Sequence, residues 1–167
     1  MSSTTASDPK TVAVSRTVAA PADTVWKLIS DVTRMGEWSP ETTACEWRGG
    51  ASAAVVGAKF SGTNQNGKKK WSTMSVVSAC EPGKSFVFDT TVGPLKISRW
   101  AYAIEDSGTA DAPACTVTET WTDRRNRLAA MFGKPASGVS DRNTHNRAGM
   151  ETTLANLAAA AEKATAG

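Results

Sequence analysis

The chain has 167 residues, of which 40% are hydrophobic and 21% are charged. This is the composition of an ordinary globular domain, and it argues against a disordered, fibrous or membrane-embedded protein. The net charge of +3 comes from 19 Lys and Arg against 16 Asp and Glu, and the basic residues are scattered except at positions 68–70 and 124–127, so we expect no nucleic-acid partner.

The first part of the chain predicts a strand followed by two short helices. Residues 1–9 are rich in Ser and Thr, which predicts a flexible N-terminal tail. From Thr11 onward apolar and polar residues alternate, as in a strand. Pro21 then opens a helix, because its missing N–H costs nothing in a first turn. Asp31 is a suitable N-cap for a second short helix that ends near Gly36.

A run of strands follows, because the hydrophobic period changes to two and turn signals recur. The predicted strands comprise residues 42–48, 58–63, 70–80, 85–90, 95–105 and 115–123. Between the second and third of them, residues 64–67 form the predicted turn, in which an Asn-Gly pair supplies the positive φ angles of a tight hairpin. Strands joined by such short turns predict an antiparallel meander.

The segment before the last helix predicts a loop. Residues 126–139 contain Gly133, Pro135 and Gly138, three residues that interrupt regular structure. We therefore expect a loop with at most one helical turn, at residues 128–132.

One long helix closes the chain. It begins at Ser140 or Asp141 and continues to about Lys163 without an internal proline, over a length of about 35 Å. Its apolar stripe, which must meet the sheet, consists of Met150, Leu154, Leu157 and Ala161. This element order predicts an α+β fold in a single domain at residues 10–164. A curved antiparallel sheet of about seven strands surrounds the long C-terminal helix, and two short helices follow the first strand.

Cysteine usage and hydropathy narrow the cellular context. Cys45, Cys80 and Cys115 lie far apart without metal-ligand spacing, so we expect buried free thiols and no metal. No apolar stretch reaches the roughly 20 residues of a membrane span, and the N-terminal residues lack the features of a signal peptide. These observations predict a cytoplasmic protein without integral membrane association and without a cofactor.

Several motifs resemble a known superfamily. The segment 18–26 (VAAPADTVW), then Ser30-Asp31, then Trp38-Ser39-Pro40-Glu41, resembles the START-related ligand-binding superfamily often called SRPBCC. Within it, the sequence is most similar to small bacterial proteins labelled polyketide cyclase/dehydrase. Residues 115–121 are similar to the penultimate element of that family. The resemblance covers about residues 10–163 and implies a helix-grip fold with an internal cavity for a small, largely apolar ligand. It implies no catalytic set.

Strand alternation places Glu119 inside the predicted sheet. Val117, Glu119 and Trp121 share one face of the last strand, whereas four threonines share the other, which suits solvent. Burial raises the pKa of a carboxyl group, so Glu119 is a candidate general acid or base. The alternative is an ion pair of Glu119 with Arg99 or Arg142 that makes the interior rigid.

Aromatic residues are candidates for the wall of the cavity. Alternation places Trp100 and Tyr102 opposite Arg99, and an inward aromatic face would join Trp71 and Trp121. Ordinary packing of sheet against helix explains the same pattern. The candidate ligand-binding residues are Trp38, Trp71, Trp100, Tyr102, Glu119, Trp121, Asn146, Met150 and Leu154, and the candidate catalytic residues are Glu119 and Tyr102.

Two single residues allow two interpretations each. His145 is the only histidine, and one histidine without a cysteine or paired-carboxylate motif predicts no zinc site. We expect it on the exposed surface, with the mouth of the cavity as the alternative. Trp38 lies where this fold often has the lip of its cavity, and we expect a structural plug, with ligand contact as the alternative.

Three hypotheses for the function follow. The first is binding or transport of a small hydrophobic ligand, either lipid-like or polycyclic as in polyketides. The second is a cyclase or dehydratase in which Glu119 and Tyr102 exchange protons with a carbonyl compound. The third is a protein-interaction module, co-chaperone-like or toxin-like, with an apolar external groove. An unpaired Glu119 that reaches open cavity volume would favour the second hypothesis over the first.

Overall fold

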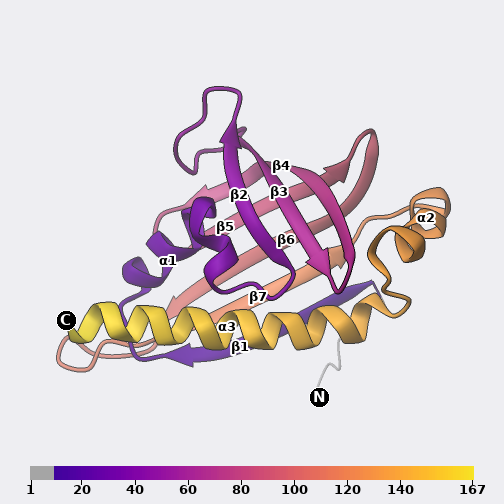
Figure 1. Cartoon of the computed structure of the whole chain (residues 1–167). Helices are drawn as coiled ribbons and strands as arrows, with labels where there is room; N and C mark the ends of the chain where they lie inside the picture. Colours follow the sequence, from indigo (N-terminus) through magenta and orange to yellow (C-terminus); the bar gives the residue numbers. More distant parts are fainter. Residues whose placement is uncertain (1–9) are drawn as a thin grey trace, which may run out of the picture.

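Seven antiparallel strands form one sheet that curves around a long C-terminal helix (Figure 1). The computed structural model describes residues 10–167, so the predicted flexible tail lies outside the described residues. The strands are β1 (Thr11–Val18), β2 (Thr42–Arg48), β3 (Lys59–Asn66), β4 (Lys69–Glu81), β5 (Ser85–Val92), β6 (Leu95–Asp106) and β7 (Cys115–Asp123). They lie in the order β1-β7-β6-β5-β4-β3-β2, so the predicted meander and the predicted fold class are confirmed.

Three short helices accompany the long C-terminal helix. Two of them lie near its C-terminal end and one near its N-terminal end (Figure 1). The helices are α1 (Ala22–Ser30), the 3-10 helix η1 (Val32–Glu37), α2 (Arg127–Ser137) and α3 (Arg142–Ala166). The side chain of Asp31 caps η1 by accepting a hydrogen bond from the Thr33 N–H, and Asp141 caps α3 in the same way through Thr144. None of the described helices is long and apolar enough to cross a membrane.

Helix α2 corrects the prediction of a loop at residues 126–139. Its first turn is capped by Asn126, whose side chain accepts a hydrogen bond of 2.9 Å from the Ala129 N–H. Its end is capped by Gly138, which has φ 74° and whose N–H donates to the Lys134 carbonyl at 2.7 Å. Pro135 lies in the last turn. Capping at both ends therefore outweighs a proline near the C-terminus.

The hairpin between β3 and β4 also differs from its prediction. Strand β3 continues to Asn66, which pairs with Lys69, so only Gly67 and Lys68 form the turn. Gly67 has φ 58°, and no residue other than glycine has a positive φ in the described part of the chain. The expected pair of positive φ angles is therefore reduced to one, because Asn66 keeps its strand conformation.

Helix α3 lies along β1 and crosses the concave face of the sheet (Figure 1). Its predicted stripe is confirmed, since Met150, Leu154, Leu157 and Ala161 are all at most 2% exposed. From Leu154 onward the stripe packs against α1 and the sheet in one close cluster of apolar side chains. Before Leu154 the stripe residue Met150 packs in a separate, smaller cluster with Val12 and Trp121, beside the site described next.

Candidate functional site

An internal cavity of about 220 Å³ lies between the sheet and the first half of α3. The start of β2, helix α2, the end of β5 and the start of β6 also line it. Most of the residues predicted to bind a ligand lie in its wall, namely Trp71, Trp100, Tyr102, Glu119, Trp121, Asn146 and Met150. Most of the residues that strand and helix periodicity predicted therefore line one and the same cavity.

Trp38 and Leu154 do not line this cavity. Trp38 is 4% exposed and packs into the core, where its carbonyl accepts a hydrogen bond of 3.1 Å from Asn156. Leu154 follows Met150 by one helical turn, and that turn carries its side chain from the cavity into the close-packed core. Neither position lines the cavity, so ligand contact there has no support from this geometry, and Trp38 lies in the core, as a structural plug would.

Glu119 and Tyr102 form a buried polar pair deep in the cavity wall. They lie directly opposite each other on β7 and β6. The Tyr102 hydroxyl donates a hydrogen bond of 2.9 Å to Glu119 Oε1, whereas Glu119 Oε2 is buried and has no partner among the described residues. The ion-pair alternative is wrong, because Arg99 pairs with Asp89 and Arg142 pairs with Glu41.

Burial keeps this pair neutral. Removal from water raises the pKa of Glu119 to about 8, although the hydrogen bond from Tyr102 lowers it in part. Burial, reinforced by the nearby Glu119, raises the pKa of Tyr102 well above its usual value. At neutral pH the carboxyl group is therefore protonated. Because Oε1 accepts from Tyr102, we assign the proton to Oε2, and the neutral acid has one free O–H donor.

A row of hydroxyl groups crosses the sheet at another part of the cavity wall. Ser75, Thr90 and Ser98 are register partners on β4, β5 and β6, they are all buried, and they line the cavity. The Ser75 and Thr90 hydroxyls are 2.9 Å apart. Our sequence analysis missed them. Strand alternation was the signal that could have found them, since Ser75 shares a face with Trp71 and Thr90 shares one with Phe88.

The remaining wall is mainly apolar. Phe60 and Phe88 contact each other edge to face, with ring centroids 5.1 Å apart, and both line the cavity. Cys45 lies beside them, and burial raises the pKa of its thiol to about 11. Cys45 and Cys115 are buried free thiols as predicted, whereas Cys80 is only partly buried. In residues 10–167 no group of three or more His, Cys, Asp or Glu side chains could hold a metal ion.

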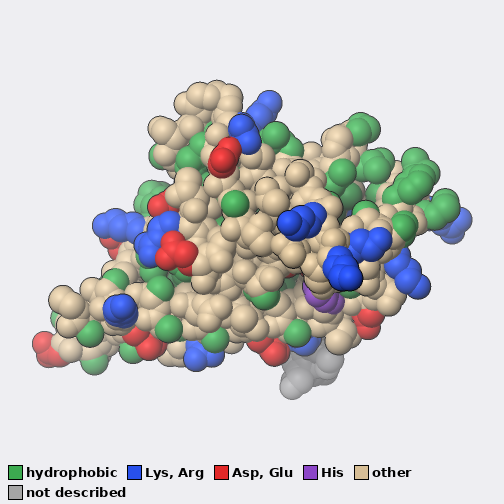
Figure 2. Space-filling model, viewed as in Figure 1, with side chains coloured by type: hydrophobic (Ala, Val, Ile, Leu, Met, Phe, Trp, Pro, Cys, Tyr) green, Lys and Arg blue, Asp and Glu red, His purple; other side chains and the backbone are tan. Residues whose placement is uncertain are grey.

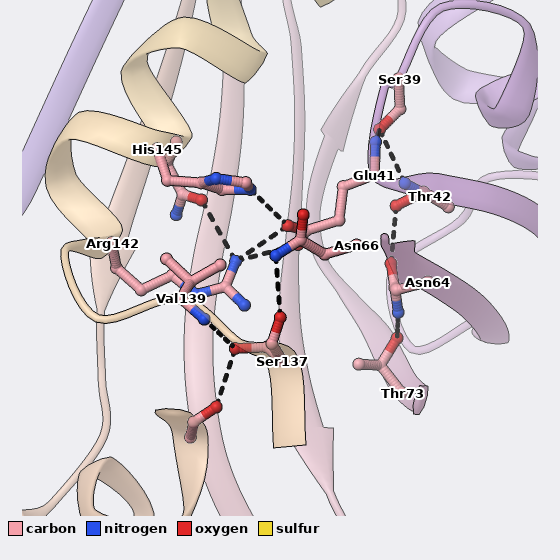
Figure 3. Close-up of polar contacts among 12 residues, drawn as sticks. Ser39, Glu41, Thr42, Asn64, Asn66, Thr73, Ser137, Val139, Arg142 and His145 are labelled. Carbon is pink, nitrogen blue, oxygen red and sulfur yellow. Dashed lines mark hydrogen bonds and ion pairs between the residues drawn. The ribbon is translucent and has the colours of Figure 1, made fainter. Parts of the chain in front are cut away.

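A cluster of ionic contacts forms one side of the mouth (Figure 3). The Glu41 carboxylate accepts hydrogen bonds of 2.9 and 3.1 Å from Arg142 and lies 2.7 Å from His145 Nε2. The Arg142 guanidinium also lies 5.6 Å from the centroid of the Trp71 ring. His145 lines the cavity with its side chain 36% exposed, so the position at the mouth is the correct alternative.

Helix α2 also lines the cavity. Its end is tied to the β3–β4 turn by a hydrogen bond of 2.9 Å from Asn66 Nδ2 to the Ser137 carbonyl (Figure 3). The side of α2 that lines the cavity carries mostly small residues, among them Ala129, Gly133 and Ala136. Small side chains leave the interior of the cavity open beneath the helix.

Comparisons with known proteins agree with this architecture. Residues 9–162 match the family described as polyketide cyclase / dehydrase and lipid transport. The solution structure of the Polyketide_cyc-like protein Cgl2372 from Corynebacterium glutamicum is similar at 30% identity and a TM-score of 0.56, and the match covers 90% of this chain and 91% of that one. No curated protein shows significant sequence similarity to the chain.

More distant structures share the fold alone. Protein NE0264 from Nitrosomonas europaea superposes with a TM-score of 0.64 at 13% identity, over 96% of this chain and 99% of that one. The di-domain ARO/CYC StfQ from the steffimycin biosynthetic pathway superposes with a TM-score of 0.65 at 16% identity, over 95% of this chain. The match covers 52% of the StfQ chain, so this chain spans about half of its length.

Proposed function

The chain belongs to the family of polyketide cyclases, dehydrases and lipid transport proteins, and on this premise we propose that it binds a small ring compound that presents one oxygen acceptor to Glu119. The observation that carries the proposal is the buried Oε2 of Glu119, which has no partner among the described residues although Glu119 lines the cavity. A buried donor without a partner costs free energy, and a ligand carbonyl would satisfy it.

The walls set the class of ligand. The rings of Trp100, Trp121, Phe60 and Phe88 line the cavity and favour a flat apolar body. A cavity of roughly 150 Å³ holds a benzene molecule. The volume of about 220 Å³ therefore suits a compact ligand with one or two rings. The hydroxyl row at Ser75, Thr90 and Ser98 offers further partners to ligand oxygens.

A matched pair of ligands tests the role of Glu119. α-Tetralone and tetralin share a two-ring skeleton, and only the ketone has an acceptor for the Glu119 proton. We expect quenching of tryptophan fluorescence by both and about tenfold tighter binding of the ketone, equal to about 1.4 kcal/mol. Glu119→Leu, which has no donor, should bind the two equally. Native mass spectrometry of the same samples should show one ligand per chain.

Two controls make this test decisive. Glu119→Gln keeps a donor at every pH, so its preference for the ketone should be constant, whereas the wild type should lose the preference above pH 8 as the carboxyl ionises. Trp121→Ala should weaken the binding of both ligands, because Trp121 forms part of the cavity wall. If the wild type binds neither compound, nor fatty acids, sterols or larger polyketide-like aromatics, the binding proposal is wrong.

A second candidate function rests on the same free proton. A neutral Glu119 would give its Oε2 proton to the hydroxyl group of a β-hydroxy ketone, which leaves as water. The carboxylate formed would then remove the proton between the two oxygen-bearing carbons, which forms the carbon–carbon double bond and restores the neutral acid. This cycle amounts to the dehydration of a carbonyl compound without any other reactant.

Mass spectrometry separates this reaction from binding alone. The wild type incubated with a β-hydroxy derivative of a cyclic ketone should release a product lighter by one water molecule. Glu119→Gln should bind the same compound and release none, since an amide cannot transfer the proton. Binding without turnover by the wild type over a panel of such compounds would leave the carrier function as the one supported.

A further inference from the structure

Helix α2 carries its large apolar side chains on its outer face. Leu128, Met131 and Phe132 are 52%, 68% and 58% exposed, and their spacing of three and four residues places them on one stripe. Pro135 continues the stripe and is also exposed. We call these four residues the α2 stripe. The buried residues of α2 are Ala129 and Ser137, so the helix buries small side chains against its own protein and exposes its large apolar ones.

This arrangement is the reverse of an ordinary surface helix, which buries its apolar face. Figure 2 shows hydrophobic side chains gathered over α2 at one end of the molecule, with Lys and Arg side chains close by. Phe132 also lines the cavity, so the stripe is continuous with the mouth. An exposed apolar patch of this kind indicates a surface that something else covers.

The surroundings of the stripe are basic. Arg127 and Lys134 lie on α2 itself, and no acidic residue occurs between Asp123 and Asp141. Lys68 in the β3–β4 turn is followed by Lys69 and Lys70 at the start of β4. This segment lies against the end of α2, where the Cγ of Lys69 is 3.6 Å from the position a Cβ on Gly138 would take. All three lysines are exposed. Within residues 10–167, none of these five basic side chains forms an ion pair.

We infer that α2 and the β3–β4 turn dock the protein on an anionic lipid membrane. A helix with an apolar face and basic flanks lies in the membrane interface, with its apolar side chains at the boundary between headgroups and acyl chains. Exposed lysines and arginines add attraction to anionic headgroups. The α2 stripe is the apolar face of such a helix, and the five basic residues are its charged flanks. Docking in this way turns the mouth of the cavity toward the membrane.

Vesicle flotation tests the docking. The full chain is mixed with vesicles of phosphatidylcholine alone, or of phosphatidylcholine with phosphatidylglycerol, at low and high salt. We expect binding to the anionic vesicles at low salt, at least fivefold weaker binding at high salt because the charges are screened, and little binding to the neutral vesicles. Lys68→Gln with Lys70→Gln should weaken binding to the anionic vesicles severalfold.

A matched pair of double variants isolates the stripe. Leu128→Gln with Met131→Gln changes two side chains of the stripe that do not line the cavity, and it should reduce vesicle binding about tenfold. Val55→Thr with Val56→Thr changes two equally exposed side chains, at 61% and 66%. They lie in the β2–β3 loop, at a different end of the molecule from α2 (Figure 1), and their loss should leave vesicle binding unchanged.

Two outcomes would overturn the inference. One is a failure of the vesicle test, in which the stripe variant binds anionic vesicles as tightly as the wild type or neither protein binds them. The other is a concentration-dependent dimer in gel filtration that the stripe variant abolishes, since a second copy would then cover the stripe. Titration of the stripe variant with α-tetralone keeps this test apart from the proposed function, because neither Leu128 nor Met131 lines the cavity.

Discussion

The two halves of helix α3 face the same sheet, but they pack against it differently. In the C-terminal half, Leu157 and Ala161 belong to a closed cluster with Val25 of α1 and Phe86 of β5, and none of these side chains is more than 1% exposed. In the N-terminal half Met150 is equally buried, but it lines the cavity. We call these regions the closed end and the open end.

The difference shows how one sheet and one long helix combine a close-packed core with a cavity. A cavity reduces stability, because the atoms that line it lack contacts on one side. A buried carboxyl group such as Glu119 adds a further cost. The closed end, where α1 packs on α3, supplies the apolar contacts that offset both. The open end is covered only by α2 and the ionic cluster of Glu41, Arg142 and His145, and so it remains accessible to a ligand.

The largest expected effect at the open end is the dependence of stability on pH through Glu119. Its pKa is raised from 4.5 in the unfolded chain to about 8 in the folded one. The folded state thus retains a proton that the unfolded state loses, and stability falls as the pH rises from 4.5 to 8. The loss is about 1.4 kcal/mol per pH unit, on the order of 5 kcal/mol in total. Urea denaturation between pH 4.5 and 9 measures it.

Glu119→Gln is the control for this dependence. Its side chain stays neutral, so its stability should be nearly flat across the window and higher than that of the wild type at pH 9. His145 is present in both proteins, so the difference between the two curves isolates Glu119. Asp89, whose pKa is lowered chiefly by the hydrogen bond from Arg99, titrates below the window. Parallel curves for the two proteins would show that Glu119 is not buried as a neutral acid.

The inward position of Glu119 followed from the sequence, because one strand alternates without interruption. Residues 115–123 form a strand with the predicted bounds, and Glu119 is buried on its inner face. Helix α2 did not follow, since Gly133 and Pro135 disfavour a helix and the caps that stabilise it act at its two ends. A strand with a clear two-residue period can thus be predicted from its local sequence. A helix such as α2 cannot, because its caps and the neighbouring segments stabilise it.

The ionic cluster at the mouth was beyond prediction for a different reason. Glu41 meets Arg142 and His145 across 101 and 104 residues of chain, and no local pattern indicates which charges will meet. Leu154 shows the same limit within one helix. It shares the apolar stripe with Met150, but only Met150 lines the cavity, and the stripe itself does not indicate which of the two will do so.

Alanine substitutions on the one face of α3 compare the two ends directly. Met150 and Leu157 are two turns apart on that face, and each is 1% exposed. Leu157→Ala opens a hole in close packing, so we expect a loss of about 3–5 kcal/mol. Met150→Ala only enlarges an existing cavity, and we expect about 2 kcal/mol. Chemical denaturation measures both losses. Equal losses would mean that the open end packs as tightly as the closed end.

The ionic cluster should contribute less than either packing site. Glu41→Gln leaves Arg142 and His145 without their carboxylate partner in a partly exposed site, and we expect a loss of about 1 kcal/mol. Glu37→Gln is the matched control, because its ion pair with Arg34 is exposed and such pairs contribute little. If both variants have the stability of the wild type, the cluster does not hold the mouth together.

The reactivity of two buried cysteines compares the accessibility of the open end with that of the closed end. Cys45 is 7% exposed and lines the cavity, whereas Cys115 is fully buried at the closed end. In a Cys80→Ser background, a small alkylating reagent at pH 9 should reach Cys45 through the mouth of the folded protein. The reaction should be slow, because burial raises the pKa of this thiol to about 11 and little thiolate is present.

Cys115 should react only when the chain unfolds, so its labelling should follow the global unfolding rate measured in urea. Peptide mass spectrometry at several times gives both rates from one sample. A bound ligand such as α-tetralone should slow the labelling of Cys45 and leave that of Cys115 to change only with overall stability. If the two cysteines are labelled at one common rate, the cavity opens only by unfolding, and the open end admits ligands no more readily than the closed end does.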